Sequence, residues 1–179
     1  MTNDQVSRLI GGSFGLAFVQ MNAGTLPTAA AAPLRVLAIL AFLRIVLTRR
    51  RPAEAVAGEA RPPRGPGFGR GYWYVVAAEV LGLGVGLYVI ANVLNTPTAS
   101  VAWIAFVVGV HFFGLAVVWK RAALHVLAGS MAVCGVVGLV LAACDVSKPV
   151  IAVVSGIVPG LLLLGSVLWS GRSAAATAQ

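Results

Sequence analysis

Carboxylates are scarce in this sequence, which has five Asp and Glu among its 179 residues. Only Glu79 lies well inside a long apolar run. No pair of carboxylates is placed to bind a metal-bound diphosphate, which argues against prenyl transfer. A lone carboxylate in an apolar run is costly to bury, so we expect Glu79 to have a partner that locates the functional site.

Cysteine and histidine are also scarce, with two residues of each. Cys134 and Cys144 stand about 15 Å apart along one expected helix, too far for a disulfide, and the sequence has no Cys-x-x-Cys motif for a thiol relay. The phosphate-binding loop, the His-Glu-x-x-His zinc motif and the Gly-x-Ser-x-Gly nucleophile motif are missing too. Because His125 is expected nearer the surface than His111 and Glu79, we predict no metal site and no cofactor.

Charged residues make up 10% of the chain and apolar residues 59%. Soluble globular domains have about a quarter of their residues charged, so this composition predicts an all-α, polytopic integral membrane bundle. The net charge of +8 resides between apolar runs and not on an amphipathic face with interleaved aromatic residues. Nucleic acid is therefore not an expected partner.

The apolar runs predict six membrane spans, since about 20 residues are needed to cross the hydrocarbon. Residues 1–179 then form a single six-helix domain with short connections. The predicted spans are Leu9 to Leu26, Ala29 to Leu47, Tyr72 to Leu94, Ala99 to Trp119, Ala122 to Cys144 and Pro149 to Trp169. Residues 48–71, rich in Arg, Pro and Gly, are expected to be a flexible cytoplasmic loop that fixes the topology or binds anionic lipid headgroups.

Lysine and arginine fall almost entirely on one side of this arrangement. Cytoplasmic loops retain positive charge, so both termini are predicted to be cytoplasmic. The residues on that side are Arg8, Arg49, Arg50, Arg51, Arg61, Arg64, Arg70, Lys120, Arg121 and Arg172. The other side has only Arg35 and Lys148. The bias toward Ala, Gly, Val and Arg is typical of a GC-rich bacterial genome, which predicts the bacterial cytoplasmic membrane as the location.

A second interpretation of the N-terminus stays open. Arg8 and the apolar stretch Leu9 to Val19 have the pattern of a signal peptide, with Ala29 to Ala32 as the cleavage region. Cleavage would leave five spans and an external N-terminus. Asp4 and the polar residues within the stretch favour a retained first span.

Small residues indicate where helices approach one another. Glycines four residues apart let two backbones come close in lipid, and such pairs occur in the first, third and sixth spans. They are Gly11 and Gly15, Gly82 and Gly86, and Gly156 and Gly160. Pro159 removes one backbone donor in the sixth span and leaves the carbonyl of Ser155 without its usual partner, so a kink is expected there.

Depth arithmetic supplies a partner for Glu79. Glu79 lies seven residues beyond Tyr72, about 10 Å inside the cytoplasmic boundary. His111 lies eight residues before Trp119 on the next, oppositely directed helix, about 12 Å from the same boundary. We therefore predict that Glu79 and His111 form a pair, with Arg44 on the second span as the rival partner.

The remaining candidate ligand-binding residues are polar side chains in the same half of the bilayer. Ser130 is expected about 12 Å deep, Ser13 and Arg44 about 7 Å deep, and His125 near the headgroups. In a low-dielectric environment burial disfavours both charged forms of a Glu–His pair, so an ion pair, a neutral pair and a shared proton are all open.

Three functions are compatible with such a pair. The first is a proton-linked small-molecule transporter or ligand-binding membrane protein, in which Glu79 and His111 exchange the proton. The second is a membrane-embedded enzyme, such as an isomerase, cyclase or lipid-modifying enzyme, doing acid-base chemistry on a lipophilic substrate. The third is a scaffold or accessory subunit in which the pair is only a polar clasp. The expected partners are the bilayer, a small lipophilic or other small-molecule ligand, and a second copy of the chain as an open alternative.

Overall fold

The computed structural model describes residues 3–48, 70–119 and 122–176, and within these ranges the ordered elements are all helical. The helices, in chain order, are α1 (Asn3–Asn22), η1 (Ala23–Thr25), α2 (Thr28–Leu47), α3 (Arg70–Asn92), η2 (Pro97–Ala99), α4 (Ser100–Trp119), α5 (Ala122–Ala143), α6 (Lys148–Ala152), η3 (Val153–Ile157) and α7 (Val158–Ala176). The elements η1 and η2 are 3₁₀ turns and η3 is a π-turn.

Five helical segments are long and apolar enough to cross a membrane. They are Thr28–Leu47, Arg70–Asn92, Pro97–Val117, Leu124–Ala143 and Lys148–Trp169. They match the last five predicted spans, so the all-α, multi-pass character of the chain is confirmed. The helix α1 has 20 residues as well, but it is not among the five, because polar residues such as Ser13, Gln20 and Asn22 interrupt its apolar stretch.

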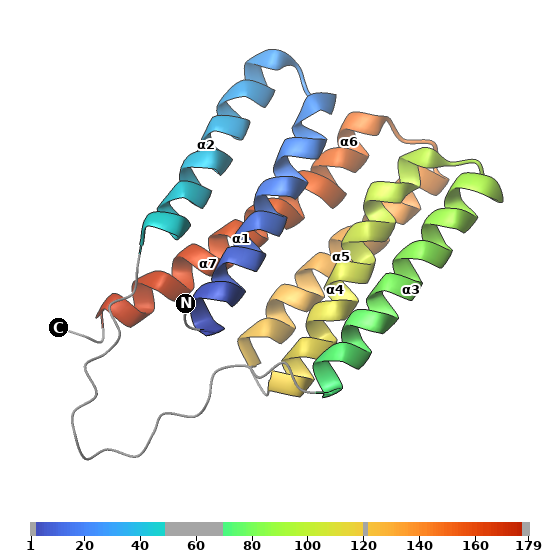
Figure 1. Cartoon of the computed structure of the whole chain (residues 1–179). Coiled ribbons are helices and arrows are strands. Elements are labelled where there is room, and N and C mark those ends of the chain that lie inside the picture. Colours follow the sequence, from blue (N-terminus) through green and yellow to red (C-terminus); the bar gives the residue numbers. More distant parts are fainter. Residues whose placement is uncertain (1–2, 49–69, 120–121, 177–179) are drawn as a thin grey trace, which may run out of the picture.

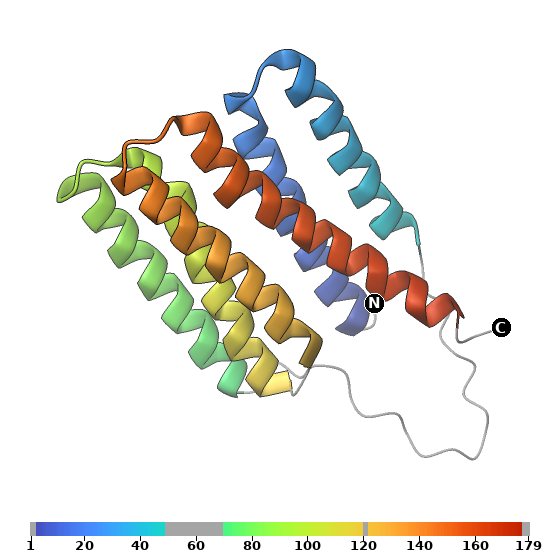
Figure 2. The same cartoon turned by 180° about the vertical axis from the view of Figure 1, so that it is seen from behind.

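The bundle has two groups of helices joined by the last one. Figure 1 shows α1 and α2 on one side and α3, α4 and α5 on the other. The continuous rod of α6, η3 and α7 runs between the two groups, as the view from behind shows in Figure 2, and α7 packs against α1, α2 and α5. We call the end where α1 begins and α7 ends the terminal end, and the end that holds η1 and η2 the turn end.

The helix α1 crosses α7 at two facing glycines. Gly15 and Gly160 are both buried, and a Cβ on either would lie 2.9 Å or 2.8 Å from the carbonyl oxygen of the other. Asn22 fills the space beside Gly156 in the same interface. Gly11 meets only the side chain of Val167. The glycine spacing therefore located a real interior face, although Gly11 contributes little to it.

The contact between α4 and α5 is equally close, and it depends on glycines that are not spaced four residues apart. A Cβ on Gly109 would lie 2.5 Å from the backbone nitrogen of Ala132. A Cβ on Gly135 would likewise lie against the backbone nitrogen of Phe106. Such backbone proximity provides the dispersion contacts that hold helices together where lipid removes the hydrophobic driving force.

The sixth predicted span continues through a π-turn close to the proline at which a kink is expected. It consists of α6, the π-turn η3 and α7, and η3 ends at Ile157, shortly before Pro159. A proline cannot donate to the helical ladder, and a π-turn re-registers the carbonyls that precede it. Ser155, fully buried in η3, donates its hydroxyl to the carbonyl oxygen of Cys134 on α5 at 3.0 Å.

One predicted boundary needs correction. The first helix spans Asn3–Asn22 and not residues 9–26. It ends early because the Asn22 amide donates to the Phe18 carbonyl at 2.8 Å and the chain then tightens into η1. The predicted basic loop, residues 48–71, lies outside the described residues except at its two edges.

Candidate functional site

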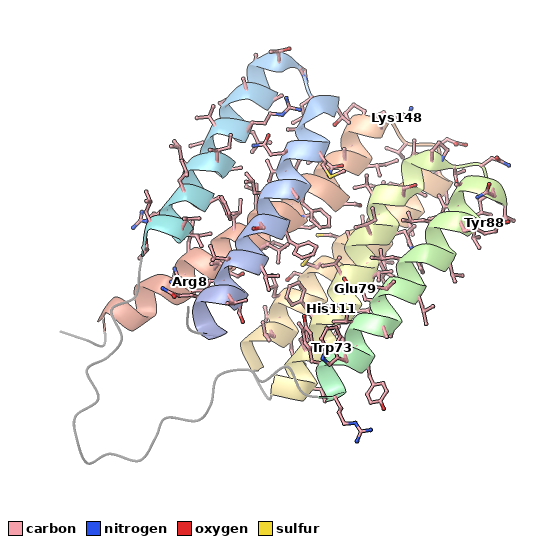
Figure 3. All side chains as sticks on the ribbon, viewed as in Figure 1. Arg8, Trp73, Glu79, Tyr88, His111 and Lys148 are labelled. Atoms are coloured by element: carbon pink, nitrogen blue, oxygen red, sulfur yellow. The ribbon has the colours of Figure 1, made fainter. Side chains whose placement is uncertain are left out.

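The candidate site lies where α3 packs against α4. Glu79 on α3 and His111 on α4 point toward one another (Figure 3), and His111 Nδ1 lies 3.0 Å from Glu79 Oε2. Val75 packs against Gly114 four residues nearer the terminal end, where a Cβ on Gly114 would lie 2.8 Å from the valine side chain. Both contacts obey one antiparallel register, so the pair results from the regular packing of two helices.

The contact is close without being an aligned hydrogen bond. Its 3.0 Å length suits a charge-assisted bond, yet Nδ1 of His111 is shielded and has no hydrogen-bond partner that satisfies the angular requirement. A proton on that nitrogen would lie in the ring plane and would point past Oε2. The two groups are therefore in contact without forming an aligned hydrogen bond.

The pair is shielded but not sealed. The side chain of His111 is 13% exposed and that of Glu79 is 16% exposed. The ring of Phe112 stands edge-on to the imidazole, with centroids 5.8 Å apart and an interplanar angle of 79°. The two polar groups thus lie among apolar side chains, with one edge open to the outside of the protein.

Trp103 on α4 contacts α3 nearer the turn end than the Glu79–His111 pair. Its indole occupies the space that a side chain at Gly86 would fill, and its Nε1 donates to the carbonyl oxygen of Gly82 at 3.1 Å. The predicted interior face of Gly82 and Gly86 is therefore a cradle for an aromatic ring and not a backbone crossing. The helix register that pairs Glu79 with His111 also places these glycines opposite Trp103. This register could have identified Trp103 from the sequence.

The rival partner Arg44 does not reach Glu79. It lies in the last turn of α2, exposed, with its carbonyl oxygen accepting from the Thr48 hydroxyl at 2.6 Å. Figure 1 shows α2 on the far side of the bundle from α3. Among the described residues no interaction joins Arg44 to the Glu79–His111 pair.

The other three candidate residues also lie apart from the pair. Ser13 is exposed on α1. Ser130 donates its hydroxyl to the Val126 carbonyl of its own helix at 2.9 Å. His125 is exposed and stands edge-on to the ring of Phe113, 6.1 Å away. In the described part of the chain the site consists of two of the six predicted residues.

A metal centre is not formed by the side chains that the structure describes. Within residues 3–48, 70–119 and 122–176, no three His, Cys, Asp or Glu side chains come together in a metal-binding arrangement. The chemistry of the site therefore has to be argued from one carboxyl group and one imidazole.

The helices define the class of protein to which this chain belongs. Five helices long and apolar enough to cross a membrane make this chain a helical, multi-pass membrane protein. The sequence matches no protein-family profile, no curated protein and no solved structure. Function is accordingly argued from the geometry of its own residues.

Proposed function

We propose that this chain is a small proton-linked membrane protein that transports or binds a small molecule, with Glu79 and His111 as the groups that take up and release the proton. The observation that carries the proposal is their 3.0 Å contact on two apolar helices, with 13% and 16% of the side chains still exposed. Ionisable residues inside membrane spans are functional by default, because a purely structural role can be filled at lower cost.

The geometry of the pair supports proton exchange. Either group can hold the single proton between them. Nδ1 of His111 can carry it and face a carboxylate, or the carboxyl group of Glu79 can carry it and face Nδ1. The contact is not an aligned hydrogen bond, so a modest side-chain rotation opens the pair to a ligand or to water. A sealed and fully hydrogen-bonded pair would suit a passive clasp better.

The topology that goes with this function has six spans, with both termini in the cytoplasm of a bacterial cell. The helix α1 has 20 residues, the same length as α2 and α4. It packs against α2, η3 and α7, and Val19 within it is fully buried. A helix with one packed face tolerates more polar residues in a membrane than a helix that faces lipid all round. The terminal end then faces the cytoplasm, where its basic residues interact with anionic headgroups.

Proteoliposomes that contain a pH-sensitive dye test the proposal. Wild-type protein is expected to give proton flux on addition of its substrate, found by screening small metabolites, and Glu79→Gln is expected to abolish it. The matched control is Asn92→Ala, which changes an exposed polar residue of the same helix whose amide bonds only the Tyr88 carbonyl. Absence of flux across a broad panel, or equal flux in Glu79→Gln, would contradict the proposal.

A membrane-embedded enzyme acting on a lipophilic substrate is the second candidate, and the place of α3 favours it. The main neighbour of α3 is α4, and α3 leaves the apolar side chains of Val80, Leu81 and Val85 exposed. A substrate dissolved in the bilayer can reach such a site sideways, with the carboxyl group as acid or base. Incubation with host lipids followed by mass spectrometry distinguishes the two: a product that requires both Glu79 and His111, without proton flux, identifies the enzyme.

A further inference from the structure

A second polar site lies at the opposite end of the bundle, between α1 and α2. The amide of Gln20 donates to the carbonyl oxygen of Arg35 at 3.2 Å, and Nη2 of Arg35 donates to the carbonyl oxygen of Gln20 at 3.4 Å. Each residue thus bonds the backbone of the other helix. This reciprocal contact fixes the direction of the arginine side chain.

The guanidinium group is held at the level of the α1–α2 connection. Arg35 lies seven residues into α2, about 10 Å along the helix from Thr28, but its side chain returns toward the turn end. There its Nη2 lies 3.1 Å from where a side chain on Gly24 would begin. The charge therefore stands at the edge of the apolar region and not at its centre.

This cation has no anionic partner among the described residues. A guanidinium stays charged at every physiological pH and has five N–H donors. One donor reaches Gln20, while Nε is shielded from solvent and has no hydrogen-bond partner. Of the described carboxylates, Glu79 contacts His111 on α4, and Asp145 is exposed and makes no ion pair in this part of the chain.

Arg35 is partly buried, and shielding a charge without a counter-charge is costly. A planar fork of unused donors matches the oxygens of phosphate and carboxylate groups. Lys148 lies at the same end of the bundle (Figure 3), where the exposed Asp145 offsets its charge, so the preference for an anion depends on Arg35 itself.

We propose that Arg35, oriented by Gln20, binds an oxyanion at the turn end of the α1–α2 interface: the phosphate of an anionic lipid, or a small phosphate or carboxylate compound from the adjoining solution. The site is independent of Glu79 and His111. It differs from the predicted headgroup contacts of residues 48–71, which are at the terminal end.

Thermal unfolding in neutral detergent tests this site. A ligand that binds only the folded state raises the unfolding midpoint. Short-chain phosphatidylglycerol is compared with the corresponding phosphatidylcholine, and inorganic phosphate with chloride at equal ionic strength. A shift with phosphatidylglycerol alone assigns the site to a lipid, and a shift with phosphate as well assigns it to a free anion.

The variants assign the shift to the arginine. Loss of a charge-assisted interaction in Arg35→Gln is expected to weaken apparent anion affinity about tenfold or more. Arg44→Gln, which removes an exposed arginine from the same helix, is the matched control and keeps the wild-type shift. Arg35→Lys keeps a charge but loses the planar fork, so its shift is smaller than that of wild type.

Three results would overturn the proposal. The first is that neither anion stabilises wild-type protein more than its control. The second is an undiminished shift in Arg35→Gln or, where that variant does not fold, in Arg35→Lys. The third is an equal loss of the shift in Arg44→Gln. Loss of proton flux in Glu79→Gln with an intact anion shift would separate this site from the proposed function.

Discussion

At the scale of single residues, one tryptophan sets the separation of α3 and α4. A Cβ on Gly86 would overlap the indole of Trp103, whereas a Cβ on Gly84 would meet nothing within 4 Å. We expect Gly86→Ala to destabilise the protein by about 1–3 kcal/mol, the usual cost of overpacking. Gly84→Ala on the same helix is expected to be neutral or slightly stabilising, since alanine favours helix over glycine.

Unfolding in mixed micelles, followed by tryptophan fluorescence, measures both glycine variants. Gly86→Ala is also expected to shift the Trp103 emission, because the ring must move from its cradle and weaken its bond to the Gly82 carbonyl. Equal stability of the two variants would show that α3 moves away from α4 at no cost.

The energy of the Glu79–His111 contact can be measured with a double-mutant cycle. Polar contacts between membrane helices average about 0.6 kcal/mol in double-mutant cycles, with a maximum of about 1.7 kcal/mol. We expect a cycle of Glu79→Gln and His111→Asn to give a coupling free energy in or below this range, since the contact is not an aligned hydrogen bond. A coupling of several kcal/mol would contradict this expectation and would mean that the two side chains form a strong, aligned bond.

Depth along a helix predicted this contact but did not predict its surroundings. Counting from the span ends places Glu79 and His111 at one level, and the structure brings these two side chains together. The same arithmetic left Arg44 as a rival, because depth does not say which helices are neighbours. Trp103 was missed for a different reason: an aromatic residue inside an apolar run has no unusual composition, and only the register of two helices reveals its partner.

At the scale of helices, the crossing of α1 and α7 depends on backbone proximity. A Cβ added to Gly15 or to Gly160 would lie less than 3 Å from the carbonyl oxygen of the other glycine, and a backbone atom cannot rotate away as a side chain can. We expect Gly160→Ala to lower stability by about 1–3 kcal/mol. Gly165→Ala in the same helix, with nothing within 4 Å, is the control and should not.

Chemical or thermal unfolding of the two α7 variants tests this crossing, with circular dichroism to verify helix content. If Gly160→Ala were as stable as Gly165→Ala, α1 would have to shift along α7 without loss. Cross-linking between α1 and α7 then reports whether the crossing point has moved.

Hydropathy predicted the five apolar helices well, because length and composition suffice for a span. It did not predict the π-turn η3 or the early end of α1. Both depend on individual polar bonds, from Ser155 to the Cys134 carbonyl and from Asn22 to the Phe18 carbonyl. The Ser155 bond joins two helices and so depends on tertiary packing, whereas the Asn22 bond lies within the last turn of α1.

At the scale of the whole molecule, the ranking of the helices by hydropathy differs from their ranking by burial. The helix α1 is too polar to count among the apolar five, yet it packs between α2 and α7 and buries Phe18 and Val19. The apolar helix α3 is peripheral, with Ile90 its sole buried residue within the described chain. A helix that faces lipid on most sides needs apolar residues all round, whereas α1 has a packed face that holds a buried polar residue, Asn22.

Membrane orientation is the last consequence of this arrangement. If the terminal end is cytoplasmic, the turn end faces outward and exposes Cys144, which follows α5. A membrane-impermeant maleimide is expected to label intact cells that express the protein, and Cys144→Ser removes the label because Cys134 is partly buried within α5. A cysteine placed at Thr48, exposed after α2, should react only after the cells are permeabilised.

The same preparation decides whether α1 is a retained span. An epitope tag placed ahead of Met1 is expected to stay on the mature chain and to resist external protease until the cells are lysed, because six spans put it in the cytoplasm. A mature chain that has lost the tag would mean cleavage and five spans. That outcome would also remove Gly15 from its contact with Gly160, so the cleaved chain would lack the helix on which α2 and α7 pack. The packing of α1 therefore favours retention independently of the charge distribution.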